Sequence, residues 1–118
     1  MTKRIIVVED DPSITEVLTI ILEQEQYRVD SFPDDSFLEG MKNDMPGLIL
    51  LDMWLSGING KNICAMIKKD NAFQQIPVVM VSANRDVKQH AEEAGADDYL
   101  PKPFDVNVLL SLVKKFMK

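Results

Sequence analysis

Apolar runs that end on polar side chains are the most informative feature of this chain. Three of them have four residues: Ile5–Val8 before Glu9, Leu48–Leu51 before Asp52, and Val78–Val81 before Ser82. A shorter run, Tyr99–Leu100, ends at Pro101 and Lys102. Such runs are typical of strands buried on both faces of a parallel sheet, and ligands bind beyond the carboxyl ends of such strands. The sequence therefore predicts a site where carboxylates, a hydroxyl and an ammonium group converge at one edge of a sheet.

Strand and helix signals alternate five times along the chain. We expect strands over residues 4–8, 28–32, 48–52, 78–82 and 98–100, with helices over about 12–25, from 33 onward, after 60, over 87–94 and over 106–116. These βα repeats predict an α/β fold, namely a doubly wound, flavodoxin-like (βα)5 domain with a five-stranded parallel sheet. The first and third strands must be neighbours if their terminal acids are to meet, which predicts the strand order 2-1-3-4-5.

Apolar residues at helical spacing predict which helix faces point inward. The stripe of the first helix includes Val17, that of the third includes Met66, and that of the last includes Val108. In the second predicted helix, we expect Phe37, Leu38 and Met41 to face inward. Asp11 is expected to cap the first helix, and Gly95 to end the fourth.

Composition limits the classes of function. The 118 residues carry a net charge of −6, which argues against direct binding to nucleic acid or to an anionic membrane surface. No apolar stretch approaches the ~20 residues of a membrane-spanning helix. The single cysteine, Cys64, has no partner for an internal disulfide, which favours a reducing, cytoplasmic location. We expect one domain over residues 1–118.

The polar residues at the predicted strand ends suit phosphoryl chemistry. Asp52 is the candidate nucleophile, because a carboxylate can attack a phosphoryl group. Glu9 and Asp10 would lie beside it, and crowded carboxylates suit Mg²⁺, which prefers oxygen ligands. Lys102 can pair with a carboxylate and a phosphoryl oxygen, and the hydroxyl of Ser82 can bind a phosphoryl oxygen. Taken singly, each of these residues is also explained as a cap, a loop residue or a surface side chain.

The segments VVEDD, LILLDMWLSGING, VVMVSA and GADDYLPKPF occur in this order along the chain. Together they resemble the receiver domain of bacterial two-component response regulators, and the likeness covers the whole chain. The resemblance implies that Asp52 accepts a phosphoryl group from a phosphohistidine, with Mg²⁺ as cofactor. The other implied roles are metal binding by Glu9, Asp10 and the backbone carbonyl of Trp54, phosphoryl contacts from Lys102 and Ser82, and an aromatic switch at Tyr99. The family also implies a cis bond between Lys102 and Pro103.

Three positions bear on how this chain would differ from its family. Ser56 stands where the family commonly carries proline, and the loss of proline adds entropy to the unfolded state. Because we expect Ser56 to touch no chemical group, it should tune function rather than abolish it. Trp54 is bulkier than many members carry, and we expect its indole to screen the phosphoryl group from water. Asn84 is the second residue expected to affect phosphate lifetime.

The resemblance implies a phosphorylation-operated switch, not an enzyme that acts on an outside substrate. A sensor histidine kinase or a histidine phosphotransfer protein would donate the phosphoryl group. The surface of helix 87–94, strand 98–100 and helix 106–116 would then change and bind an unknown downstream protein or output domain; we expect no output domain in this chain. A phosphorylation-dependent homodimer is left open. Leu112 stands where receivers attached to DNA-binding domains usually carry arginine, so we do not expect the form of dimer that is usual in those relatives.

Two other classes of protein fit less well. The first is a protein-interaction module with the same fold that never carries phosphate, but such members typically lack the acceptor aspartate or the lysine. The second is an enzyme or flavin protein of similar fold. A haloacid-dehalogenase-type phosphatase needs Asp-x-Asp, and segment 52–54 lacks the second acid. A flavodoxin needs a hydroxyl- and glycine-rich loop where this chain has residues 9–12.

Overall fold

One parallel sheet of five strands, in the order β2-β1-β3-β6-β7, organises residues 3–117, which a computed structural model describes. Its strands are β1 (Arg4–Val8), β2 (Arg28–Phe32), β3 (Leu48–Asp52), β6 (Val78–Ser82) and β7 (Asp98–Pro101). The predicted order 2-1-3-4-5 is therefore confirmed when the sheet strands alone are counted. Residues 1, 2 and 118 of the expected domain lie outside the described part.

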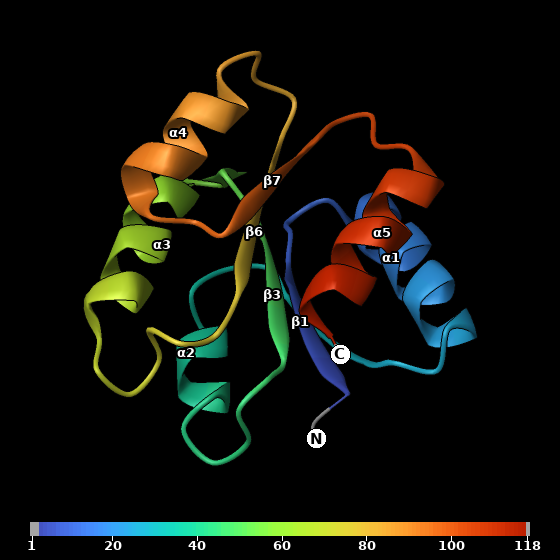
Figure 1. The fold of residues 1–118 in the computed structure, drawn as a ribbon, viewed down its shortest axis with the longest axis horizontal. Coiled ribbons are helices and arrows are strands. Elements are labelled where there is room, and N and C mark those ends of the chain that lie inside the picture. Colours follow the sequence, from blue (N-terminus) through green and yellow to red (C-terminus); the bar gives the residue numbers. More distant parts are fainter. Residues whose placement is uncertain (1–2, 118) are drawn as a thin grey trace.

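The helices cover both faces of this sheet (Figure 1). They are α1 (Pro12–Gln24), α2 (Phe37–Gly40), α3 (Gly60–Lys69), α4 (Val87–Ala94) and α5 (Val106–Phe116). Figure 1 shows α1 and α5 on one face, with α2, α3 and α4 on the other. This arrangement confirms the doubly wound α/β fold. Within the described residues, no helix combines the length and apolar character needed to cross a bilayer.

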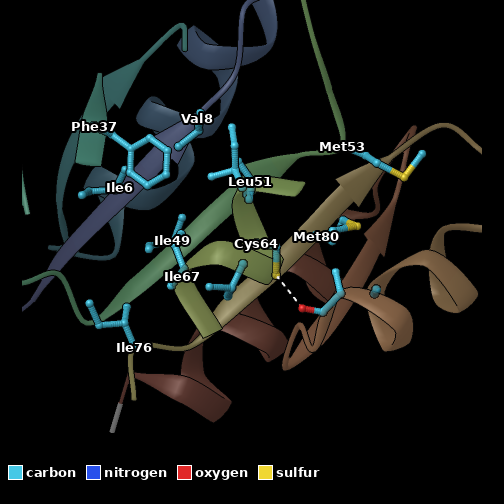
Figure 2. Packing of buried hydrophobic residues seen from close by; sticks show 14 of the residues in the cluster. Ile6, Val8, Phe37, Ile49, Leu51, Met53, Cys64, Ile67, Ile76 and Met80 are labelled. Atoms are coloured by element: carbon cyan, nitrogen blue, oxygen red, sulfur yellow. Dashed lines mark hydrogen bonds between the residues drawn. The ribbon is translucent and has the colours of Figure 1, made fainter. Parts of the chain in front are cut away.

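Strand β1 shows why its sequence is a continuous apolar run. Ile6 and Val8 pack into the cluster that contains Phe37 of α2 (Figure 2). Ile5 and Val7 pack into the opposite cluster, which contains Leu22 of α1 and side chains of α5. Because alternate side chains of a strand point to opposite faces, a strand covered on both sides needs apolar residues at every position. The strand ends are thus fixed by packing on two sides.

The pairing register carries the ends of these strands to one edge. Strands β1 and β3 pair in parallel through Val8 and Leu51, so the residues that follow them, Glu9 and Asp52, emerge at the same level. Strands β6 and β7 pair through Ser82 and Pro101. Lys102 comes directly after this last pair. The sheet therefore delivers acids and an ammonium group to the same edge, as the sequence predicts.

Three apolar residues of the helix stripes are largely exposed. Val17, Met66 and Val108 expose 47%, 51% and 47% of their surface. Helical spacing marks an apolar stripe, but the sheet covers only the central part of it, as on α1, where Leu18 and Leu22 are buried. The helix expected to open at residues 33–36 begins only at Phe37, and α2 has 4 residues.

Local signals at the chain turns are confirmed. Asp11 caps α1, since its Oδ1 accepts a hydrogen bond of 2.9 Å from the backbone N–H of Ser13. Gly95 ends α4 with a φ of 79°, in the left-handed region that favours glycine. The Lys102–Pro103 peptide bond is cis. The loop expected around residues 56–60 contains a small antiparallel hairpin of β4 (Trp54–Leu55) and β5 (Ile58–Asn59).

Candidate functional site

Three carboxylates meet where β1 and β3 end. Glu9, Asp10 and Asp52 each offer an oxygen atom, and these atoms all lie within 4.8 Å of one another. Glu9 and Asp52 are 6% and 7% exposed, whereas Asp10 is half-buried. The strand register explains the meeting, because it aligns the residues that follow Val8 and Leu51. We call these three side chains the acid trio.

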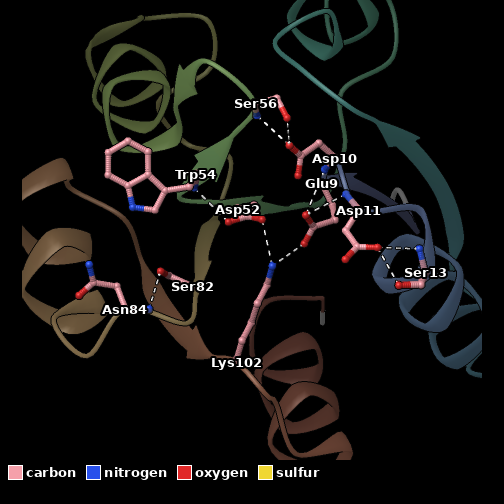
Figure 3. Close-up of polar contacts among 10 residues, drawn as sticks. All are labelled: Glu9, Asp10, Asp11, Ser13, Asp52, Trp54, Ser56, Ser82, Asn84 and Lys102. Carbon is pink, nitrogen blue, oxygen red and sulfur yellow. Dashed lines mark hydrogen bonds and ion pairs between the residues drawn. The ribbon is translucent and has the colours of Figure 1, made fainter.

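The side chain of Lys102 extends from the segment after β7 toward Glu9 and Asp52 (Figure 3). Its Nζ donates hydrogen bonds of 2.7 Å to Glu9 Oε1 and 2.9 Å to Asp52 Oδ2. Its backbone N–H donates to the carbonyl of Ser82 at 2.8 Å, which ties the residue to the end of β6. One ammonium group, held after β7, therefore links the acids that follow β1 and end β3.

The electrostatics of the site follow from burial and crowding. Burial, together with the hydrogen bond to Asp52, raises the pKa of Glu9 to about 7. Burial acts to lower the pKa of Lys102, but hydrogen bonds to Glu9 and Asp52 outweigh it and raise this pKa. The hydroxyl of Ser56 holds the pKa of Asp10 below its ordinary value. The site thus holds more negative charge than one ammonium group neutralises.

The donor set fits a magnesium ion. Mg²⁺ prefers oxygen ligands and is usually bound through one or two carboxylates, with water and phosphate completing its shell. The acid trio supplies such oxygens at one place, and a bound cation would favour the ionised form of Glu9, whose pKa is raised chiefly by burial. Glu9, Asp10 and Asp52 are the residues that would hold the ion. A role for the carbonyl of Trp54 stays a prediction.

The remaining predicted residues surround the end of β3. Ser82 is buried at the end of β6, beside β3, and its Oγ accepts a hydrogen bond of 3.0 Å from the N–H of Asn84. The N–H of Trp54 donates to Asp52 Oδ1 at 3.0 Å, while its side chain is 59% exposed. Figure 3 shows the indole on the same side of Asp52 as Asn84. Tyr99 is half-buried and packs against the core cluster under α3 and α4.

The expectation that Ser56 touches no chemical group is wrong. Its backbone N–H and its hydroxyl both donate to Asp10 Oδ2, at 2.7 and 2.5 Å. A proline at this position has neither donor. The contact joins residues 46 positions apart and depends on the β4–β5 hairpin, which sequence patterns did not predict. A serine in a turn-rich loop gives no separate signal for it.

Gly60 is a second site residue that the sequence patterns do not single out. A Cβ atom added at Gly60 would lie 2.1 Å from the backbone oxygen of Asp52 and 3.0 Å from the Cα of Met53. The first turn of α3 therefore packs directly on the backbone of the candidate acceptor. A glycine at the start of a helix is the available signal, but a turn-rich loop accounts for such a glycine equally well.

Comparison with known proteins places the chain in a family. The model of the response regulator receiver domain matches residues 5–114, and the chain belongs to this family. The chain is 38% identical over 117 residues to the DNA-binding response regulator MtrA of Mycolicibacterium smegmatis. That match covers 97% of this chain and 50% of the relative, so the chain spans about half the length of the curated relatives it matches.

Solved structures agree with this assignment. A protein from Chloroflexus aurantiacus described as a response regulator superposes with a TM-score of 0.92 at 27% identity, and the match covers 98% of each chain. The BeF₃-activated N-terminal receiver domain of Klebsiella pneumoniae RstA gives a TM-score of 0.87 at 27% identity, again over 98% of each chain. The resemblance inferred from the four sequence segments is therefore confirmed.

Replacing Glu9 by glutamine should stabilise the magnesium-free protein at pH 8. The pKa of Glu9 lies at about 7 in the folded state, against an ordinary value of 4.5, so the folded state keeps a proton that the unfolded state loses. Stability then falls as pH rises through this window, and the neutral variant avoids the loss. We expect Glu9→Gln to gain on the order of 2 kcal/mol at pH 8 and nothing at pH 4 in urea unfolding. A difference independent of pH, or one shared by the exposed Glu92→Gln, would contradict this.

Replacing Gly60 by alanine should displace the backbone of Asp52. The new methyl group would overlap the Asp52 carbonyl, so the chain must shift there. We expect the amide NMR signals of Asp52 and Met53 to move and stability to fall by about 1–3 kcal/mol. Gly95→Ala is the matched control, since it introduces strain at a φ of 79° but lies 3.6 Å from Lys68, away from the acid trio. Unshifted Asp52 and Met53 signals in Gly60→Ala would refute the close contact.

Proposed function

We propose that this domain is a phosphoacceptor switch in which Asp52 takes a phosphoryl group from a phosphohistidine, with Mg²⁺ bound. The donor would be a sensor histidine kinase or a histidine phosphotransfer protein. The observation that carries the proposal is the position of Lys102 Nζ, 2.9 Å from Asp52 and 2.7 Å from Glu9. A fixed cation beside a buried carboxylate is the arrangement that stabilises charge on an incoming phosphoryl group.

In the proposed transfer, an oxygen of Asp52 forms a bond to phosphorus as the P–N bond of the phosphohistidine breaks. The electron pair of that bond stays on the imidazole nitrogen. The N–H of Trp54 holds Oδ1 of Asp52 at 3.0 Å and so fixes the plane of the carboxylate. Lys102 keeps its contact with Glu9 and donates a second hydrogen bond to a phosphoryl oxygen. Bound Mg²⁺ would neutralise negative charge on the transferring group.

The proposed response begins at Ser82. Its oxygen accepts a hydrogen bond from Asn84, which leaves its own proton available for a phosphoryl oxygen. Movement of Ser82 toward the phosphoryl group would open space for Tyr99, which already packs against the neighbouring core. The surface of α4, β7 and α5 would then change and bind a downstream protein or output domain. The domain acts as an acceptor and switch, not as an enzyme on an outside substrate.

Charges on this surface bear on self-association. Glu93 pairs with Lys61 at 2.5 Å, and Asp98 pairs with Lys115 at 3.1 Å within the chain. Acids that already have partners within the chain offer less to a second copy, which, like Leu112, argues against the homodimer form usual in DNA-binding relatives. The proposal includes a cytoplasmic location and leaves open a different phosphorylation-dependent homodimer.

Acetyl phosphate with Mg²⁺ should add one phosphoryl group to the protein. Intact-mass spectrometry should show this addition in the wild type and its absence in Asp52→Asn, because the amide cannot form an acyl phosphate. Asp35→Asn, which replaces an exposed aspartate outside the acid trio, should be modified normally. An unmodified wild type would favour the phosphorylation-independent interaction module, and modification of Asp52→Asn would reject Asp52 as the acceptor.

Trp54→Asn should shorten the lifetime of the phosphorylated state. The proposed cause is that the indole, together with Asn84, limits the approach of water to the phosphoryl group. Dephosphorylation should be followed after removal of acetyl phosphate, with Met66→Asn as a control, because Met66 has a similarly exposed apolar side chain on α3. An unchanged decay rate in Trp54→Asn would reject the screening role.

A further inference from the structure

We propose that Ser56 is a positioning residue for the metal site, which raises the affinity for Mg²⁺ by holding Asp10 in place. The inference rests on the proposed function, in so far as the acid trio must bind Mg²⁺. It goes beyond that function because it assigns part of the metal affinity to a residue outside the acid trio. It also links occupancy of the site to the β4–β5 hairpin.

The three acids are held in different ways. Glu9 and Asp52 are buried, and Lys102 donates a hydrogen bond to each of them. Asp10 is only half-buried, and its Oδ2 receives both hydrogen bonds from Ser56, at 2.7 Å from the N–H and 2.5 Å from the hydroxyl. Ser56 therefore holds Asp10 through hydrogen bonds, as Lys102 holds Glu9 and Asp52.

Two donors on a single oxygen fix the orientation of a carboxylate. With Oδ2 of Asp10 occupied by Ser56, Oδ1 is left for coordination. A half-buried side chain that is already oriented loses less conformational freedom when a ligand binds. Hydrogen bonds to ligating carboxylates are typically worth about 10–100-fold in metal affinity. The Ser56 contact should therefore strengthen binding of Mg²⁺ instead of competing with it.

The hairpin presents both donors of Ser56. Residues Trp54 and Leu55 pair with Asn59 and Ile58, so the turn between them contains Ser56. If Ser56 raises the affinity for the metal, bound metal must by the same free energy stabilise the contact between Asp10 and the hairpin. Trp54, the only tryptophan in the sequence, begins this hairpin and provides a fluorescence reporter.

Three substitutions at one position separate the two donors. Ser56→Thr keeps the N–H and the hydroxyl, Ser56→Ala removes the hydroxyl, and Ser56→Pro removes both. Affinity for Mg²⁺ should fall in that order, with Ser56→Thr close to the wild type and Ser56→Pro weaker by about 10-fold or more. Thermal unfolding without Mg²⁺ should show that each variant is folded.

The matched control is Ser13→Ala. Ser13 donates to Asp11 Oδ1 through its N–H at 2.9 Å and its hydroxyl at 2.7 Å, the same pair of contacts on the neighbouring acid. Asp11 does not belong to the acid trio. Loss of this hydroxyl should therefore leave the affinity for Mg²⁺ unchanged.

The test is titration with MgCl₂ in the absence of any phosphodonor, followed by Trp54 fluorescence and by calorimetry. Binding by the wild type, weakened in Ser56→Ala and further in Ser56→Pro but not in Ser13→Ala, supports the inference. Equal or tighter binding by the Ser56 variants would overturn it while leaving the metal site intact. Absence of binding by the wild type in calorimetry would overturn both the inference and the proposed metal site.

Discussion

The bridge from Lys102 to Glu9 and Asp52 is the interaction on which the rest of the site depends. It exists only because β1 and β3 are adjacent and paired in register, and because β7 brings Lys102 to the same edge. Packing on both faces of the sheet fixes these strand ends, so the side chains meet without having to order a mobile loop. The same parallel sheet, covered on both faces, therefore requires the apolar runs and brings the polar residues that follow them together.

One ammonium group does not balance three carboxylates, and burial together with the hydrogen bond to Asp52 raises the pKa of Glu9 to about 7. We propose that a bound cation offsets this excess negative charge. Gly60 and Ser56 show that neighbouring segments of the chain contact the acid trio closely. Gly60 lets α3 rest on the backbone of Asp52, and Ser56 ties the hairpin to Asp10. We thus propose that function in this domain arises from carboxylates held close together at the edge of a rigid sheet.

The sequence predicts the features that depend on short-range patterns and on strand order. Buried apolar runs locate β1 and β3, and the polar residues at the ends of these runs identify Glu9 and Asp52 as candidates for the site. Burial on helices is less predictable, because spacing marks an apolar stripe without showing how much of it the sheet covers, as Met66 illustrates. The contacts of Ser56 and Gly60 depend on how distant backbone segments approach each other, which no local pattern encodes.

The most direct measurement is a crystal structure of the wild-type domain with Mg²⁺ and beryllofluoride, an analogue of the phosphoryl group. The account predicts beryllofluoride on a carboxylate oxygen of Asp52, a metal ion contacting Glu9, Asp10 and Asp52, and Lys102 Nζ within hydrogen-bonding distance of a fluorine atom. Beryllofluoride bound elsewhere, or a metal ion that does not contact the acid trio, would contradict it.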